Sequence, residues 1–309
     1  MSLEEIRKQF AANQIAKPEY IDRMHEVHAC LFEYAGYIGQ TDISKIEITD
    51  GMVVMTSRED SVKILCDPDD KRIAPIEILN FMDYEKVDSR MVFRLVHDGD
   101  RILDVGANIG WYSISLAKRY PNCTIQAFEP IPKTFGYLAK NVGLNGVANI
   151  RLNNFGFSNT AAELTFYYYA TGSGNASSAK LADLAGVQEI KCRVMPMDDF
   201  LREQVDSIDF IKCDVEGAEL MVFQGGMNSL RAHKPVVFSE MLRKWSAKFG
   251  YHPNEILELF AGLGYRCFAA RGDRLVEFMT ITDETIETNF FFLHREKHAR
   301  QIQSLADET

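Results

Sequence analysis

The fold of this chain is decided by the stretch Leu103-Asp104-Val105-Gly106-Ala107-Asn108-Ile109-Gly110. This stretch ends a strand pattern over residues 101–105 and precedes a helical pattern over residues 111–120. In an open α/β sheet, ligands bind beyond the carboxyl ends of the strands, where a strand turns into a helix. Small residues in such a turn let a ligand approach the amides of the helix N-terminus. We call residues 103–110 the glycine loop and expect it to bind a ligand through Gly106, Ala107, Asn108 and Gly110.

After residue 100 the chain alternates between strand and helix patterns, which is typical of a parallel sheet covered on both faces. The predicted strands are residues 101–105, 124–128, 149–153, 208–214, 236–240, 266–269 and 289–294. The predicted helices are residues 111–120, 133–144, 216–230 and 253–263. No clear helix joins the last two strands, so the last strand is expected to run antiparallel. The predicted fold class is therefore α/β, a Rossmann-like doubly wound sheet of seven strands within residues 98–309.

Residues 1–97 follow a different pattern and are predicted to form a smaller α+β region. Apolar residues at helical spacing predict a first helix: Ile21, Met24, Val27 and Leu31. Asp50-Gly51 is typical of a hairpin turn, and a second helical stripe runs over residues 84–95. This region is interpreted either as an acceptor-binding element or as the contact of a homo-oligomer. At the other end of the chain, the polar tail from Glu296 is expected to fray.

The composition argues against several classes of protein. The formal net charge of −10 disfavours a nucleic-acid partner, because phosphate backbones are attracted by positive surfaces. The six cysteines form no CxxC pair and are expected to be reduced. The charged N-terminus does not resemble a signal peptide, and no apolar run approaches the ~18 residues of a membrane span. The sequence therefore predicts a cytoplasmic protein with no membrane span.

Asn108 bears on which cofactor the glycine loop binds. A dinucleotide fingerprint that begins at Gly106 requires a second glycine at position 108, so that the backbone can approach the pyrophosphate. Asn108 would crowd that group, and a cofactor without a pyrophosphate fits better. S-adenosylmethionine, with its ribose, adenine and charged amino-acid tail, is the cofactor that we expect.

The next two strand ends supply further candidates for this cofactor. Glu129 ends the second strand, roughly twenty residues after the loop, where an acidic side chain can accept hydrogen bonds from ribose hydroxyls. Pro130 follows Glu129 and is assigned to the same cofactor site. Asn154 and Phe155 follow the third strand and are expected near the adenine.

The fourth and fifth strands end in carboxylates. Asp214, Glu216 and Glu240 are the predicted catalytic residues, which could hold the cofactor's ammonium or take a proton from a hydroxyl. Asp214 is also assigned to the cofactor. Glu219 is interpreted instead as an acid that stabilises a helix N-terminus. The cluster could bind Mg²⁺, but carboxylates alone do not select a metal, so no metal site is predicted.

Five motifs in this order resemble the FkbM family of methyltransferases: residues 103–110, Ala127-Phe128-Glu129-Pro130, Met197-Asp198-Asp199-Phe200, residues 208–219 and Val237-Phe238-Ser239-Glu240. The resemblance covers roughly residues 84–240. It implies a class I methyltransferase fold and transfer to oxygen, commonly a hydroxyl of a sugar or secondary metabolite. It also implies that Asp104, Gly106, Glu129 and Asp214 belong to the cofactor site. Met197 replaces a more usual leucine, and Gly156-Phe157 replaces Ala-Leu.

Three other functions remain as alternatives. These are N-methylation of a small molecule, nicotinamide-dependent oxidoreduction on the same type of sheet, and a binding scaffold that transfers nothing. A long excursion over residues 158–194 contains the Gly/Ser-rich stretch 172–178, which is either a plain loop or a lid over the site. The identity of the acceptor is not predicted.

Overall fold

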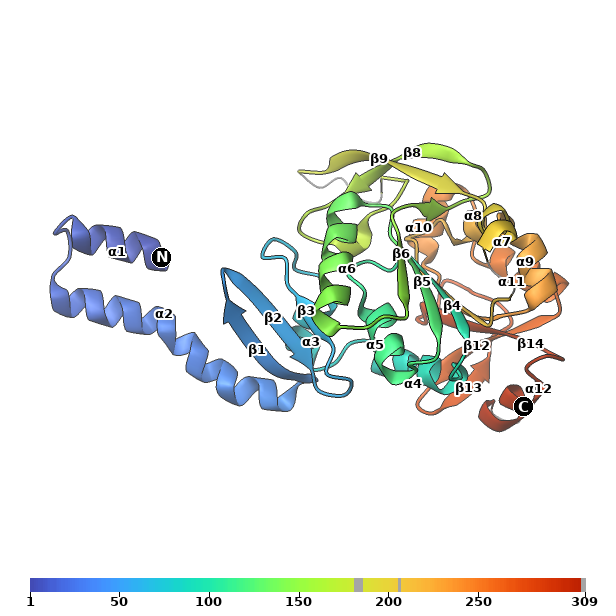
Figure 1. Ribbon diagram of the computed structural model, residues 1–309, viewed down its shortest axis with the longest axis horizontal. Coiled ribbons are helices and arrows are strands. Elements are labelled where there is room, and N and C mark those ends of the chain that lie inside the picture. The colour runs from blue at the N-terminus through green and yellow to red at the C-terminus, as the bar shows by residue number, and fades with distance from the viewer. Residues whose placement is uncertain (181–185, 205–206, 307–309) are drawn as a thin grey trace.

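A computed structural model of the protein describes residues 1–180, 186–204 and 207–306, and Figure 1 shows its arrangement. Within the described residues, one sheet of eight strands forms the body. In spatial order its strands are β13 (Arg274–Glu277), β12 (Tyr265–Arg271), β14 (Asn289–His294), β11 (Val236–Glu240), β10 (Phe210–Cys213), β4 (Arg101–Val105), β5 (Thr124–Phe128) and β6 (Ile150–Asn153).

The sheet confirms the predicted α/β fold class. Strands β11, β10, β4, β5 and β6 pair in parallel, and β14 runs antiparallel to both of its neighbours, as the missing crossover helix predicted. The count of seven strands was one short, because β13 pairs with β12 through a tight turn at the sheet edge. Only Leu275 of β13 is fully buried, so this strand lacks the apolar run that marks its neighbours.

Two hydrophobic clusters cover the two faces of this sheet. The neighbouring residues Ile102 and Leu103 belong to different clusters, as the alternation of side chains along a strand requires. One cluster contains Phe223 and Phe260 from helices on one face, and the other contains Leu116 from the opposite face. Burial on both faces explains why the central strands are largely apolar in the sequence.

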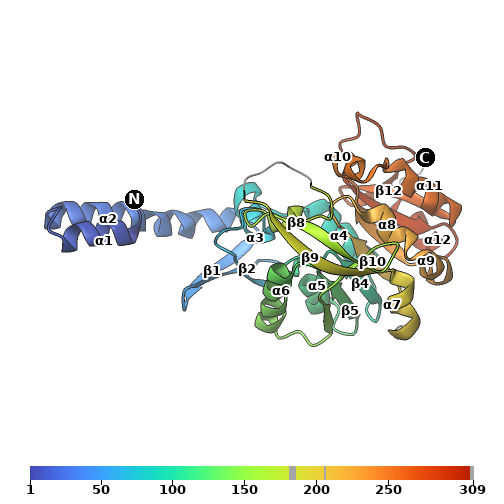
Figure 2. The same cartoon turned by 90° about the horizontal axis from the view of Figure 1, so that it is seen from above.

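The helices of the body lie on both faces of the sheet (Figure 2). They are α4 (Lys86–Leu95), α5 (Trp111–Arg119), α6 (Pro132–Asn145), α7 (Met197–Gln204), α8 (Glu219–Gln224), α9 (Met227–His233), α10 (Arg243–Ser246), α11 (Asn254–Gly262) and α12 (Ala299–Leu305).

Two helix predictions need correction. The helix predicted over residues 216–230 is divided into α8 and α9 at Gly225 and Gly226. A Cβ atom on Gly225 would lie 2.1 Å from the carbonyl oxygen of Ser158, so this close approach of two chain segments requires glycine. The tail after Glu296 does not fray throughout, because α12 buries Ile302 and Leu305 against the body.

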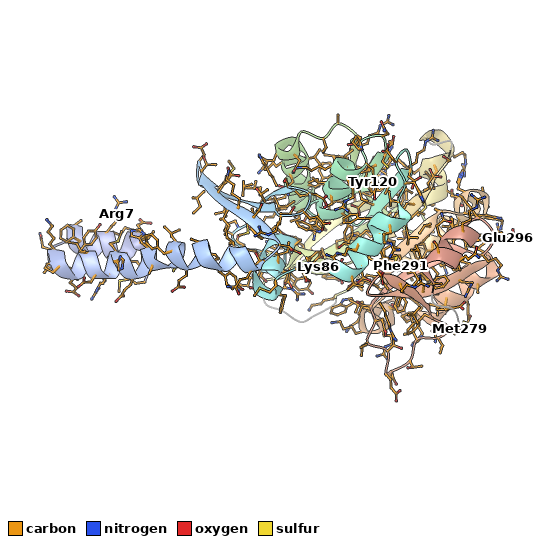
Figure 3. All side chains as sticks on the ribbon, turned by 90° about the horizontal axis from the view of Figure 1, so that it is seen from below. Arg7, Lys86, Tyr120, Met279, Phe291 and Glu296 are labelled. Atoms are coloured by element: carbon orange, nitrogen blue, oxygen red, sulfur yellow. The ribbon has the colours of Figure 1, made fainter. Side chains whose placement is uncertain are left out.

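The N-terminal region (residues 1–97) adds the antiparallel sheet β1 (Ile43–Thr49), β2 (Met52–Ser57) and β3 (Lys63–Leu65), and the helices α1 (Leu3–Ala11), α2 (Lys17–Tyr37) and α3 (Ala74–Phe81). The hairpin at Asp50-Gly51 is confirmed, with both residues at positive φ. The helix predicted from Ile21, Met24, Val27 and Leu31 is also confirmed, as α2. However, α2 buries none of its residues, and α1 and α2 project from the body (Figures 1 and 2). In Figure 3, Arg7 lies on this projection and Lys86 on the body.

The excursion over residues 158–194 is more ordered than a plain loop. Strands β8 (Ala162–Tyr168) and β9 (Gln188–Met195) pair antiparallel, and β7 (Gly156–Phe157) joins β9 in a third sheet. Residues 181–185 of this excursion lie outside the described part. Among the described helices, none is both long and apolar enough to cross a membrane.

Candidate active site

A cavity of about 460 Å³ opens at the carboxyl ends of β4, β5, β10 and β11. Its lining includes most of the residues predicted for the site: Gly106, Ala107, Asn108, Glu129, Pro130, Asp214, Glu216 and Glu240. It also includes residues of the N-terminal region, among them Tyr84 and Glu85; the sequence offered this region as a possible acceptor-binding element but singled out none of its residues for the site. The cavity therefore combines the strand ends of the sheet with a wall from outside the sheet.

The glycine loop is shaped by contacts that only glycine permits. Gly106 has a φ of +76°, and a Cβ atom there would lie 1.8 Å from the carbonyl oxygen of Asp214. The amides of Gly106 and Ala107 donate to the carbonyl oxygen of Phe128, at 3.0 and 2.9 Å. Asn108 has a φ of +49°, a conformation that asparagine tolerates better than most residues. The loop is thus held against β5 and β10, with its small residues facing the cavity.

Glu129 is fixed directly to the glycine loop. Its Oε2 atom accepts a hydrogen bond from the amide of Asn108 at 3.1 Å, and its Oε1 atom accepts one from the amide of Ile131 at 2.8 Å. Burial raises the pKa of Glu129 to about 7, although both amide hydrogen bonds oppose that shift. A carboxylate offers about four acceptor sites, so these two bonds leave acceptor capacity toward the cavity.

Four of the predicted cofactor residues are not among the described residues that line the cavity: Asp104, Gly110, Asn154 and Phe155. Asp104 is fully buried beneath the loop, and Gly110 packs against Leu138 at the start of α5. Asn154 donates to the carbonyl oxygen of Glu129 at 2.8 Å, which supports the wall from behind. Phe155 packs in an aromatic cluster with Phe128. Their geometry favours a supporting role over direct contact with a ligand.

Lys212 is a central residue of the site that the sequence analysis missed. It is 5% exposed, and its Nζ atom donates to the carbonyl oxygen of Gly106 at 2.8 Å. The same atom lies 3.3 Å from Asp214 and 3.6 Å from Asp104. Burial opposes the charge of Lys212, yet the two carboxylates raise its pKa above the ordinary value. Lys212 therefore ties the glycine loop to the end of β10.

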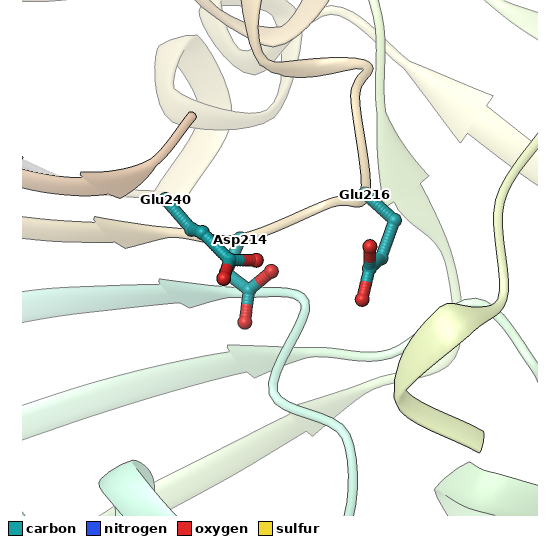
Figure 4. A group of neighbouring side chains, drawn as sticks. All are labelled: Asp214, Glu216 and Glu240. Carbon is teal, nitrogen blue, oxygen red and sulfur yellow. The ribbon is translucent and has the colours of Figure 1, made fainter. Parts of the chain in front are cut away.

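Asp214, Glu216 and Glu240, which we call the carboxylate cluster, converge at one end of the cavity (Figure 4). One carboxylate oxygen of each lies within 4.8 Å of the others. Burial and the nearby Asp214 raise the pKa of Glu216 to about 9 and that of Glu240 well above its usual value. Glu216 also has a buried oxygen with no hydrogen-bond partner among the described atoms. These raised pKa values mean that Glu216 and Glu240 tend to keep their protons near neutral pH, and a bound cationic group or divalent metal would favour their ionised forms.

Glu219 has the structural role that the sequence predicted. Its Oε1 atom accepts from the amides of Val215 and Gly217, at 3.2 and 3.0 Å, and its Oε2 atom accepts from the hydroxyl of Tyr251 at 3.1 Å. These bonds fix the turn between β10 and α8. Glu219 thereby positions Glu216 without lining the cavity.

Residues 171–178, which we call the cover segment, contact several walls of the cavity. The amide of Ser173 donates to Asp70 at 2.9 Å, and its hydroxyl donates to the Asn108 side chain at 3.2 Å. The hydroxyl of Ser177 donates to the carbonyl oxygen of Glu216 at 2.9 Å. The cover segment thus connects the N-terminal region, the glycine loop and the carboxylate cluster. Its role as a lid stays a prediction.

The strand order and the position of the cavity are those of a class I methyltransferase fold. The family model described as Methyltransferase FkbM domain matches residues 104–267, which is more than half of the chain. The chain therefore belongs to the FkbM methyltransferase family. This membership favours a methyl donor over a nicotinamide cofactor in the cavity.

Several curated relatives share this segment. The chain is 30% identical over 146 residues to Methyltransferase 1 of Beauveria bassiana, which covers 41% of this chain and 59% of that protein. It is 30% identical over 155 residues to 31-O-demethyl-FK506 methyltransferase FkbM of Streptomyces tacrolimicus, with the same coverage of 41% and 59%. The matched segment thus spans less than two thirds of these relatives.

Solved structures with a similar fold are more distant. A methyltransferase FkbM from Methylobacillus flagellatus KT aligns over 64% of this chain and 45% of its own, with a TM-score of 0.42 and 17% identity. The O-methyltransferase TomG from Streptomyces achromogenes, solved in complex with SAM, aligns over 68% of this chain and 79% of its own, with a TM-score of 0.41 and 14% identity.

Proposed function

We propose that this protein transfers a methyl group from S-adenosylmethionine to a hydroxyl oxygen of a small acceptor, such as a sugar or a secondary metabolite. The observation that carries the proposal is the hydrogen bond between the amide of Asn108 and Glu129, which fixes a carboxylate beside the glycine loop. This pair presents a ribose acceptor next to a loop that is too crowded for a pyrophosphate. Family membership supports methyl transfer as the reaction.

Different residues of the cavity bind different parts of the donor. Glu129 accepts hydrogen bonds from the ribose, and the glycine loop allows the donor to approach backbone atoms. Asp214 offers a carboxylate to the ammonium group, and Lys212 holds that carboxylate in position. S-adenosylmethionine would supply a methyl group bound to a sulfonium sulfur. The acceptor atom would attack the methyl carbon in line with the carbon–sulfur bond, and the sulfur would leave as a thioether. Holding donor and acceptor at the approach distance supplies much of the rate enhancement.

The carboxylate cluster acts on charge in this scheme. A bound cation favours the ionised forms of these carboxyl groups, so the cluster favours the cationic donor over the product S-adenosylhomocysteine, which has lost the positive charge of the sulfonium. Glu240 and Glu216 lie beside Asp214. In this proposal they are the acidic groups nearest to the positive charge of the sulfonium. We expect transfer to proceed without Mg²⁺ and therefore to persist in EDTA. Loss of turnover in EDTA with recovery in Mg²⁺ would assign the cluster to a metal.

Calorimetric titration with S-adenosylhomocysteine tests the donor site. The wild-type protein is expected to bind it with a Kd on the order of micromolar, a typical range for enzyme ligands. Glu129→Gln should weaken the binding by about tenfold, because a neutral amide accepts hydrogen bonds less strongly and can present only one oxygen. Glu284→Gln, on the exposed surface, is the matched control and should bind as the wild type does.

The outcomes separate the proposal from its alternatives. A wild-type protein that binds NADH but not S-adenosylhomocysteine would contradict the donor assignment. Equal affinity of Glu129→Gln and wild type would remove Glu129 from the ribose site. Labelled S-adenosylmethionine, incubated with the protein and a panel of hydroxylated and amino compounds, then reports the acceptor atom. Label found only on nitrogen would replace O-methylation by N-methylation, and label on neither class, despite donor binding, would favour a scaffold.

A further inference from the structure

The cavity has a wall that the family match does not include. The glycine loop from Asp104 onward, Glu129 and the carboxylate cluster all lie within residues 104–267. The opposite wall contains Glu77 on α3 and Tyr84 and Glu85 at the start of α4, all outside the matched segment. A fold family keeps its common ligand site in common elements, while specificity is added by elements of the individual chain. This wall is therefore where a chain-specific ligand is expected.

Glu85 is held in this wall by an unusual backbone and a strong side-chain contact. It has a φ of +45°, which is uncommon for a residue other than glycine, directly before α4. The hydroxyl of Tyr112 donates to its Oε2 atom at 2.6 Å. Tyr112 is 6% exposed and lies on α5, the helix that begins at the glycine loop. Glu85 is thus fixed relative to the donor loop although it comes from the N-terminal region.

The neighbours of Glu85 combine aromatic faces with negative charge. The Tyr84 ring packs edge to face with Trp111, at 6.1 Å between ring centroids, and both residues line the cavity. Burial raises the pKa of Glu85 to about 7; its hydrogen bond from Tyr112 opposes this shift, whereas the charge of Asp214 adds to it. A carboxyl group of this kind can exchange a proton near neutral pH. Glu85 and Asp214 would repel an anionic ligand, so the wall fits a ligand without negative charge.

We propose that Tyr84, Glu85 and Tyr112 form the acceptor subsite, and that it binds an uncharged hydroxylated acceptor whose hydroxyl group donates a hydrogen bond to Glu85. This inference rests on the proposed methyl transfer. As the acceptor oxygen forms its bond to the methyl carbon, the carbon–sulfur bond breaks and its electron pair stays on sulfur. The hydroxyl proton passes to the Glu85 carboxylate. One sulfonium, one alcohol and one carboxylate thus give a thioether, a methyl ether and a carboxylic acid.

The first arm of the test asks whether Glu85 contacts the donor. Calorimetric titration with S-adenosylhomocysteine is carried out on wild type, Glu85→Gln, Glu129→Gln and the control Glu284→Gln. Glu85→Gln should bind within about twofold of wild type, whereas Glu129→Gln should be weaker by about tenfold. A loss of tenfold or more in Glu85→Gln would place Glu85 in the donor site and overturn the inference. Absence of binding by the wild type would instead overturn the proposed function.

The second arm tests whether the subsite stays open beside the bound product. Carboxyl groups are labelled with a water-soluble carbodiimide and glycinamide, and modified peptides are counted by mass spectrometry with and without S-adenosylhomocysteine. Glu85 should be labelled in both conditions, whereas Asp214 should be protected by the ligand. Protection of Glu85 by the ligand, or no labelling of Glu85 in the free protein, would overturn the inference. This readout does not depend on knowing the acceptor.

The third arm measures the proton transfer itself, with the acceptor returned by the labelled screen. Glu85→Gln should lower kcat by about 10²-fold, the lower end of the range for a lost general base, and leave the KM for S-adenosylmethionine nearly unchanged. The pH dependence of kcat should also lose its acidic limb in this variant. An unchanged kcat would exclude Glu85 from proton transfer.

Discussion

The replacement of Lys212 by methionine should destabilise the protein strongly, whatever its substrate. Lys212 is buried, and it lies 3.6 Å from Asp104 and 3.3 Å from Asp214. Methionine keeps most of the side-chain volume and removes the charge. Asp104 is 0% exposed, and apart from its ion pair its Oδ1 atom has no hydrogen-bond partner among the described atoms. The variant therefore leaves a buried carboxylate with no neutralising charge beside it, supported only by the hydrogen bond that the Ser113 hydroxyl donates to its Oδ2 atom at 2.5 Å.

The cost can be estimated from comparable buried pairs. Removal of one partner of a buried ion pair costs about 3–5 kcal/mol, because the remaining charge is left desolvated. Asp214 contributes less to this cost, since its side chain is 34% exposed and water can solvate it. A loss of this size should lower the Tm of the protein by roughly 10 °C. Lys248→Met, at an exposed lysine, is the matched control and should change the free energy of unfolding by less than about 0.5 kcal/mol.

Urea unfolding, followed by tryptophan fluorescence, measures these differences. The double variant Lys212→Met/Asp104→Asn removes both charges of the buried pair. It should be more stable than Lys212→Met alone, with a coupling free energy of about 1–3 kcal/mol between the two positions. A Lys212→Met variant within 1 kcal/mol of wild type, or a double variant that shows no coupling, would refute the argument that Lys212 compensates Asp104.

Two further predictions concern Gly106 and Glu219. Gly106→Ala should abolish binding of S-adenosylhomocysteine and lower the Tm, because its Cβ atom would lie 1.8 Å from the Asp214 carbonyl oxygen; Gly143→Ala, with nothing within 4 Å in α6, is the control and should not reduce either. Burial raises the pKa of Glu219 to about 7, so its contribution to stability is fully present below its unfolded pKa of ~4.5 and is lost as the pH rises to about 7. Urea unfolding should therefore show a lower free energy of unfolding at pH 8 than at pH 5, with up to about 3 kcal/mol of the difference due to Glu219. The difference should be smaller in Glu219→Gln. Equal differences in the two proteins would contradict the assignment.

The parallel part of the fold was predictable because it depends on local patterns. Strands buried on both faces, such as β4 and β10, are largely apolar apart from Arg101, Asp104 and Lys212, and the glycine loop marks where one of them ends. The division between α8 and α9 was not predictable, because Gly225 is required by its approach to Ser158, far away in the sequence. A glycine pair inside a helical pattern signals a break, but it does not reveal the partner that causes it.

The donor side that we propose for the site consists of residues predicted from the same rules. Glu129 and Asp214 follow strands whose carboxyl ends meet at one edge of the sheet, and both line the cavity. A signal for Lys212 was also present. It stands inside the buried strand β10, between Ile211 and Cys213, and a lysine in such a place needs a buried partner. The apolar residues around Lys212 predicted the strand, and the charge of Lys212 was not considered in that prediction.

The acceptor side that we propose gave no comparable signal for individual residues, and the reason lies in how Glu85 is positioned. Neither its backbone conformation nor its contact with Tyr112 follows from neighbouring residues, because residues 85 and 112 are brought together only when α4 packs against the body. The two sides of the cavity therefore depend on different information. Strand order places the donor groups, which is why they coincide with the family segment 104–267, whereas tertiary packing of the N-terminal region places Tyr84 and Glu85. Changes in how that region packs can alter the acceptor wall while the glycine loop and Glu129 keep their geometry.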